Sequence, residues 1–145
     1  MNWNNIPNGE RLRLWKKLRE DIENVEFDLQ LHSIARFCAQ MPIGHRTVDY
    51  YTPEDWPTPW EILFHGTFCT SSISLLMFHT FCLLPDKGHT CDLFLIEDED
   101  VYLVPIIDNQ FILNYELGTI SKYSDVETNF KVLKKIQQDK IKTIT

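Results

Sequence analysis

The sequence has only five glycines among 145 residues, and they form no glycine-rich phosphate-binding loop. This argues against a nucleotide-binding protein. Basic residues are also few, because 14 Lys and Arg stand against 21 Asp and Glu, a formal net charge of −7. Nucleic-acid-binding proteins need a basic surface, and anionic lipid repels an acidic one. We therefore expect neither a nucleic acid nor a membrane as partner.

The four cysteines lack the paired CxxC spacing of a zinc site, so no metal and no other cofactor is predicted. Residues 1–5 show neither the basic region nor the apolar core of a signal peptide, which makes reduced thiols in the cytoplasm the default expectation. The apolar stretch 68–84 is interrupted by serine, threonine and histidine and falls short of the roughly 18 residues of a membrane span. A cytoplasmic protein of one domain, 1–145, is expected.

Two amphipathic helices are predicted in the N-terminal part, 10–40. In residues 10–24, apolar side chains recur at spacings of three and four, with charges on the other face. These apolar residues are Leu12, Trp15, Leu18 and Ile22. A second pattern with the same periodicity runs from Phe27 to Ala39 and stops before Pro42. We expect this helical pair to cover the core.

Residues 50–66 are rich in signals for helix starts. Thr58 and Glu61 have the spacing of a capping box, so a short helix over 59–65 that ends at Gly66 is expected. A longer buried helix, 70–84, then begins directly after Cys69. Aromatic side chains gather just before this cysteine, either as part of the core or as one wall of a cleft for an extended substrate. They are Tyr50, Tyr51, Trp56, Trp60 and Phe64.

Two runs of eight residues, 89–96 and 101–108, have the pattern of strands, and the four acidic residues between them suit a hairpin turn. If the hairpin closes symmetrically, Ile96 faces Val101 and His89 faces Asp108. Directly opposed residues have Cβ atoms about 4.5–5.5 Å apart, so a hydrogen bond between imidazole and carboxylate is expected. A register change of one residue would turn Asp108 to the other face.

Cys69, His89 and Asp108 thus have the residue types that nucleophilic catalysis needs. The thiolate is the attacking species, and both a helix N-terminus and a neighbouring imidazolium favour it. The carboxylate fixes the imidazole tautomer and stabilises its charged form. His65 is a fallback base, whereas His79 lies ten residues along the same helix, about 15 Å from Cys69. The alternative is that Cys69 packs as a small buried hydrophobe.

The C-terminal part predicts a third strand over 111–115, after a kink at 108–110, and a turn at 116–119. Residues 128–138 suit either a helix or an edge strand, and we expect a helix followed by a short strand. Lysines of this tail are interpreted as a solvated face. They are Lys131, Lys134, Lys135, Lys140 and Lys142. The predicted fold is α+β: the N-terminal helical pair, a Cys-His-Asp core over 50–120 with a central buried helix and an antiparallel sheet, and the helix and strand tail, 121–145.

The order of these motifs resembles the transglutaminase-like branch of the papain-type cysteine superfamily. The matching residues are WPTPWEILFHGTFCTSSISLLMFHTF followed by GHTCDLFLIEDEDVYLVPIIDN. The resemblance implies Cys69 as nucleophile, His89 as general base and Asp108 as its orienting carboxylate. It also implies oxyanion donors from the Cys69 backbone amide and from Trp60 or Trp56. More loosely, the chain resembles small uncharacterised proteins of large tailed phages.

Two functions follow from this resemblance. The first is acyl transfer or amide hydrolysis on a protein or peptide-like substrate, through a thioester on Cys69. The second is a catalytically inactive transglutaminase-like domain that acts as a phage structural, assembly or interaction module with partner subunits, in the host cytoplasm or the virion. A redox sensor that pairs Cys69 with Cys82 or Cys91 is a third possibility.

Overall fold

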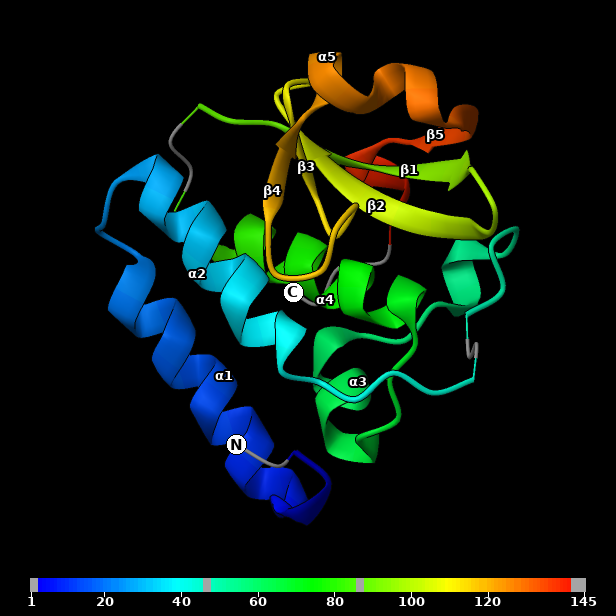
Figure 1. The fold of residues 1–145 in the computed structure, drawn as a ribbon. Coiled ribbons are helices and arrows are strands. Elements are labelled where there is room, and N and C mark those ends of the chain that lie inside the picture. Colours follow the sequence, from blue (N-terminus) through cyan, green and yellow to red (C-terminus); the bar gives the residue numbers. More distant parts are fainter. Residues whose placement is uncertain (1–2, 46–47, 86–87, 142–145) are drawn as a thin grey trace.

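A five-stranded antiparallel sheet and a layer of helices make up the fold, and the predicted α+β class is confirmed (Figure 1). The computed structural model describes residues 3–45, 48–85 and 88–141. The α-helices are α1 (Asn8–Ile22), α2 (Phe27–Ala39), α3 (Pro59–His65), α4 (Thr70–Leu83) and α5 (Tyr123–Val126). The strands are β1 (Cys91–Glu97), β2 (Val101–Ile107), β3 (Phe111–Leu113), β4 (Ile120–Lys122) and β5 (Lys131–Ile136). In space the strands follow the order β4-β3-β2-β1-β5.

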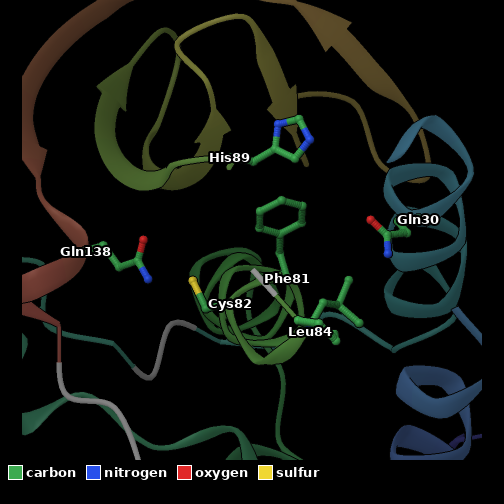
Figure 2. A pocket seen from close by; sticks show the side chains of 7 residues that line it. Gln30, Phe81, Cys82, Leu84, His89 and Gln138 are labelled. Carbon is green, nitrogen blue, oxygen red and sulfur yellow. The ribbon is translucent and has the colours of Figure 1, made fainter. Parts of the chain in front are cut away.

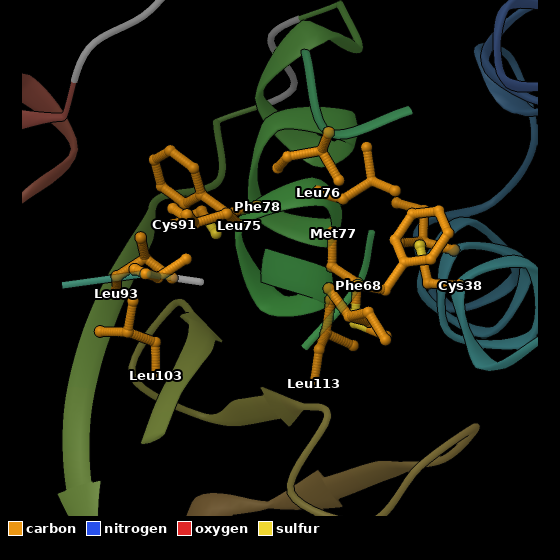
Figure 3. Close-up of a cluster of buried hydrophobic side chains, with 14 of the residues drawn as sticks. Cys38, Phe68, Leu75, Leu76, Met77, Phe78, Cys91, Leu93, Leu103 and Leu113 are labelled. Carbon is orange, nitrogen blue, oxygen red and sulfur yellow. The ribbon is translucent and has the colours of Figure 1, made fainter. Parts of the chain in front are cut away.

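The central helix, α4, is apolar around most of its circumference because it is covered on both sides. It packs between β1 and β2 on one side and α2 on the other. Leu75, Leu76 and Met77 have no exposed surface, and they belong to the same hydrophobic core as Leu93 and Leu103 of the sheet (Figure 3). Burial of each such side chain stabilises the fold by about 1.5–3 kcal/mol. This packing fixes both ends of α4 relative to the sheet.

The short helix α3 forms as its sequence predicts. The Glu61 amide donates to Thr58 Oγ1 (3.2 Å), and the Thr58 amide donates to the Glu61 carboxylate (3.1 Å), so the capping box is complete. Gly66 ends the helix with φ +70°, a left-handed conformation that glycine adopts without strain. The next residues lead directly into α4.

The β1–β2 hairpin forms, but its register differs by one residue from the prediction. Glu97 pairs with Val101 and Ile96 with Tyr102, so the turn is one residue tighter than expected. In this register His89 does not face Asp108 across a ladder. Asp108 instead leaves the strand with φ +56°, and its amide donates to the Thr90 carbonyl (2.9 Å). This left-handed residue turns the carboxylate back toward His89.

The prediction of a helix over 128–138 was wrong. Residues 131–136 form β5, which pairs with β1 and leaves its other edge unpaired in the described sheet. The short helix α5 lies earlier and covers the face of the sheet opposite α4, where Tyr123 and Phe130 pack. The predicted solvated lysines Lys131, Lys134, Lys135 and Lys140 are exposed, and Lys142 lies outside the described residues. Charged side chains of this kind discourage pairing of an edge strand with another sheet.

The two N-terminal helices are confirmed, with α2 packed on α4 and α1 packed on α3. Among the residues that the structure describes, no helix has the length and apolar character needed to cross a lipid bilayer.

Candidate functional site

Cys69 is the N-cap residue of α4. Its amide donates to Ser72 Oγ (2.9 Å), and its Sγ accepts from the Ser72 amide (3.4 Å), so the pair forms a reciprocal cap. The residue is only 3% exposed. A helix N-terminus favours negative charge, because its first amides lack intrahelical acceptors. The thiol therefore has the expected position, although one of the amides of the first turn already binds it.

A cavity of about 760 Å³ opens at this end of α4, and we call it the Cys69 cavity. Cys69 and Ser71 contribute from the helix, Asp100 and Tyr102 from the hairpin, and Asn114 from the end of β3. Asn114 is 4% exposed and has φ +63°, and its amide nitrogen donates to the Thr70 carbonyl (3.1 Å) and to Ser74 Oγ (2.8 Å). The sequence analysis did not single out Asn114, because no motif marks it. No histidine lines this cavity in the described part of the chain.

His89 and Asp108 form the expected pair. His89 Nδ1 lies 2.6 Å from Asp108 Oδ2, and the Thr90 amide donates to Asp108 Oδ1 (2.8 Å). The imidazole stacks on Phe27 of α2, with ring centroids 3.8 Å apart. The two side chains are 28% and 25% exposed. The carboxylate thus holds the imidazole in one orientation, as predicted.

Cys69 does not lie near this pair, and the expectation that the three side chains would meet was wrong. His89 packs against Phe81 in the last turns of α4, with ring centroids 6.4 Å apart. The rise from Cys69 to Phe81 along a helix is about 18 Å. The other end of the hairpin lies beside Cys69, since the Leu103 amide donates to Ser71 Oγ (3.2 Å). Thiol and imidazole therefore occupy opposite ends of α4.

The short connection after α4 explains this separation. From Leu83 to His89 the chain advances six residues, which span at most about 20 Å when fully extended. The helix has 14 residues and is therefore about 21 Å long. A connection that returned to the N-terminus of α4 before His89 would have to be fully extended. Instead the chain enters the sheet near the C-terminal end of α4, and β1 runs back toward the N-terminal end of this helix.

The remaining predicted residues also lie outside the Cys69 cavity. Trp56 is 3% exposed, and its Nε1 donates to the Asp49 carbonyl (2.6 Å). Trp60 packs edge-on against Trp15 of α1, with centroids 5.2 Å apart. Neither indole lines the cavity, so their role as oxyanion donors stays a prediction. His65, the fallback base, is exposed at the end of α3.

His79 is buried within α4 and packs edge-on against Phe78. Burial lowers its pKa to about 4, because the apolar surroundings disfavour the charged imidazole. It lies well beyond the first turns of α4 and does not line the Cys69 cavity.

A smaller cavity of about 260 Å³ lies at the C-terminal end of α4, lined by His89, Phe81, Cys82 and two glutamines (Figure 2). Cys91 lies behind Cys82 and is 1% exposed, and its pKa is raised by burial and by a hydrogen bond with the Cys82 thiol. A redox pair of Cys69 with either residue is wrong on geometry, because both lie at the opposite end of α4. Among the described residues, no group of three or more His, Cys, Asp or Glu is arranged to hold a metal ion.

Replacement of Asp108 by alanine is expected to lower the free energy of unfolding by about 2 kcal/mol. The change removes the carboxylate that accepts from His89 and Thr90, and it places alanine at a left-handed position. Asn109 has the same φ of +56° and is exposed, so Asn109→Ala is a matched control that costs about 1 kcal/mol or less. Urea denaturation measures both. Equal losses would contradict a stabilising role for the carboxylate.

Comparison with solved structures identifies the fold as transglutaminase-like. Three of the matching structures are of LapG from Legionella pneumophila, a transglutaminase-like cysteine protease. The calcium-bound form is 15% identical, with a TM-score of 0.69 over 88% of this chain and 75% of LapG. A second structure and an EGTA-treated form are both 14% identical, with TM-scores of 0.72 and 0.71 over 90% of this chain and 74% of LapG.

No protein-family model matches the sequence, and no curated protein matches it. The predicted transglutaminase-like fold is therefore confirmed from structure alone. None of the three matches bears on the looser resemblance to phage proteins, which stays a prediction.

Proposed function

We propose that this chain is a transglutaminase-like domain that binds a protein or peptide-like partner and does not catalyse a Cys-His-Asp reaction. The observation that carries the proposal is the separation of Cys69 from His89 along α4. A general base must lie within about 2.6–3.2 Å of the proton it takes, or one water molecule away. An imidazole beside Phe81 does not meet this requirement for a thiol at the start of the helix.

Both parts of the predicted triad, Cys69 and the His89–Asp108 pair, have a structural role that explains their presence without catalysis. Cys69 caps α4 through Ser72. The His89–Asp108 pair closes the open end of the hairpin and stacks on Phe27, which ties the sheet to α2. The residue types of a triad are thus explained by a helix cap and a strand anchor.

The Cys69 cavity is the candidate binding site. Its volume of about 760 Å³ lies within the range of known ligand sites, about 300–1,000 Å³. Tyr50, Tyr102 and Tyr115 line it. Tyrosine offers contact area with few rotamers to order, and its hydroxyl adds a hydrogen-bonding group, which suits recognition of a polypeptide.

A second candidate is thiol-dependent hydrolysis by Cys69 with a different base. The fold shared with LapG favours it, as does the position of Cys69 in a cavity at a helix N-terminus. The Gly44 amide donates to the carbonyl of Phe68, the residue before Cys69 (2.7 Å). The exposed His45 directly follows Gly44 in the chain. His45 is therefore the base to test in this case.

Alkylation of the native full chain with iodoacetamide between pH 5.5 and 9 separates these possibilities. For a binding domain we expect Cys69 to react no faster below pH 8 than a simple thiol, whose pKa is about 8.5. Peptide mapping by mass spectrometry follows each cysteine separately, with Cys69→Ala as the blank. His45→Gln and His89→Gln should leave the rate at Cys69 unchanged.

Fast alkylation of Cys69 well below pH 8 would contradict the binding-domain proposal. If His45→Gln then slows the reaction, the second candidate holds. If His89→Gln slows it and His45→Gln does not, the original triad forms in solution. Either result requires an activated thiol, which a purely structural cap does not provide.

A further inference from the structure

Four consecutive carboxylates, Glu97 at the end of β1 and Asp98, Glu99 and Asp100 in the turn to β2, form a cluster that we call the acidic turn. All four residues are exposed. Among the described residues, no Lys, Arg or His forms an ion pair with any of them. Like charges at this spacing repel one another. Lys131 of β5 lies opposite Glu97 and offsets part of this repulsion, but it does not line the Cys69 cavity with Asp100.

Two cavities meet at the acidic turn. Asp100 and Tyr102 line both the Cys69 cavity and a neighbouring cavity of about 800 Å³, which the other three carboxylates also line. The Tyr102 hydroxyl donates to Asp98 (3.0 Å), so one carboxylate is held in place by the strand. Asp100 therefore stands at the junction, next to the cavity that contains Cys69.

The rest of the Cys69 cavity combines an apolar rim with a buried polar group. Ile43 and Leu117 line it and are 51% and 47% exposed, which is high for large aliphatic side chains. Asn114 is almost fully buried at its base. Its amide nitrogen is occupied by two acceptors, whereas no donor from the described residues reaches its Oδ1. Among the described side chains, the fully buried polar atoms without a partner are Trp3 Nε1 and Arg19 Nε, so Asn114 Oδ1 is reached by solvent in the cavity.

We propose that the Cys69 cavity binds an extended polypeptide segment in which a lysine or arginine contacts Asp100 and a neighbouring aliphatic side chain contacts Ile43 and Leu117. This inference rests on the proposed binding function and names the class of partner. Charge complementarity selects the basic residue, since anionic ligands are repelled by the acidic turn. In the proposed complex, a backbone amide of the segment donates to Asn114 Oδ1 in place of water.

Selection of peptides against the full chain tests this inference. A displayed library of random twelve-residue peptides is selected on the immobilised protein, and the selected peptides are synthesised with a fluorescent label for anisotropy titrations. We expect selected sequences to be enriched in Lys or Arg beside Leu, Ile or Val. We expect Asp100→Asn to weaken binding about fivefold, as for a strong exposed ion pair.

Matched variants separate the local contact from the overall charge. Glu20→Gln removes the same charge from the exposed face of α1 and should leave affinity unchanged. Leu117→Ser should weaken binding without changing its salt dependence. High salt should reduce the effect of Asp100→Asn, because exposed charges are screened.

The inference is overturned if selected peptides show no enrichment in basic residues, or if Asp100→Asn and Glu20→Gln behave alike. It is also overturned if sedimentation shows a dimer that Asp100→Asn dissociates, since the occupant would then be a second copy that presents its lysine-rich β5. Failure of the proposed function is a different result. If a selected peptide binds at Asp100 and is then cleaved, the inference about the partner stands, but the proposal that the domain does not catalyse a reaction is refuted.

Discussion

Replacement of Arg11 by methionine is expected to lower the free energy of unfolding by about 3 kcal/mol and the melting temperature by about 10 °C. Arg11 is 5% exposed although it carries a full charge. Its guanidinium donates to the carbonyls of Leu63 (2.6 Å) and Phe64 (2.8 Å) at the end of α3, and to the Ile6 carbonyl (2.6 Å). Methionine fills most of the space but leaves these buried acceptors without donors.

Arg13→Met is the matched control for Arg11→Met. Arg13 lies on the same helix, is exposed and pairs with Glu10, so its loss should cost less than about 0.5 kcal/mol. Chemical denaturation measures both variants. If they lose equal stability, the Arg11 contacts with α3 do not contribute, and the helix propensity of α1 explains the loss.

The Arg11 contacts also bear on the candidate site. A Cβ at Gly66 would lie 2.6 Å from Arg11 Nη2, so the turn that leads from α3 into Cys69 is packed directly against this guanidinium. The position of the α4 N-terminus therefore depends on α1. We infer that α1, which lines none of the cavities described above, fixes the position of the turn that leads to Cys69.

Local sequence signals predicted the helices α1 to α4 well. The capping box at Thr58 and Glu61, the left-handed end at Gly66 and the start of α4 after Cys69 each depend on residues within one helical turn. Such signals are strong because the backbone groups that they satisfy are next to them in the chain. The periodicity of α2 predicted its bounds from Phe27 to Ala39 for the same reason.

The contact between His89 and Asp108 was predicted correctly from an incorrect register. The symmetric hairpin opposed these two residues, whereas the observed ladder ends at Cys91 and Ile107. The contact forms because Asp108 adopts a left-handed conformation, which aspartate tolerates better than most residues. Neither hydrophobic alternation nor turn length carries information about this single dihedral angle.

The distance between Cys69 and His89 was not predicted because it depends on how the hairpin lies on α4. Residue order alone allows either end of the hairpin to lie beside Cys69. The five residues between Leu83 and His89 favour the observed arrangement, and this connection length was the signal in the sequence. The strand β5 was missed because Val132 and Leu133 suit a helix as well as an edge strand, and only pairing with β1 decides.

The fold and the candidate site therefore lead to different conclusions about chemistry. The match to LapG establishes the fold of the chain. At 14–15% sequence identity, the roles of individual LapG residues cannot be assigned to residues of this chain. Asp100, Tyr102 and Asn114 line the cavity that contains Cys69, and no histidine of the described residues lines it. The Cys69 cavity is lined by one carboxylate, three tyrosines and an amide, and these groups are the basis of the binding function that we propose.

Acidification from pH 7 to pH 4.5 is expected to destabilise the protein by about 2.5 kcal/mol through His79 alone. Burial lowers the pKa of His79 to about 4 in the folded chain, from its ordinary value of 6.5. Between these two values the unfolded chain binds a proton that the folded chain does not. Stability therefore falls as the pH is lowered from about 6.5 toward 4, and it levels off for this group below 4.

The variant His79→Gln isolates this effect, since glutamine does not titrate. We expect the free energy of unfolding of the wild type and the variant to converge as the pH falls, with the difference changing by about 2.5 kcal/mol between pH 7 and 4.5. Urea denaturation at each pH measures it. A difference that stays constant would mean that His79 is solvated in the folded chain, and that the middle of α4 is less tightly covered than its packing between α2 and the sheet requires.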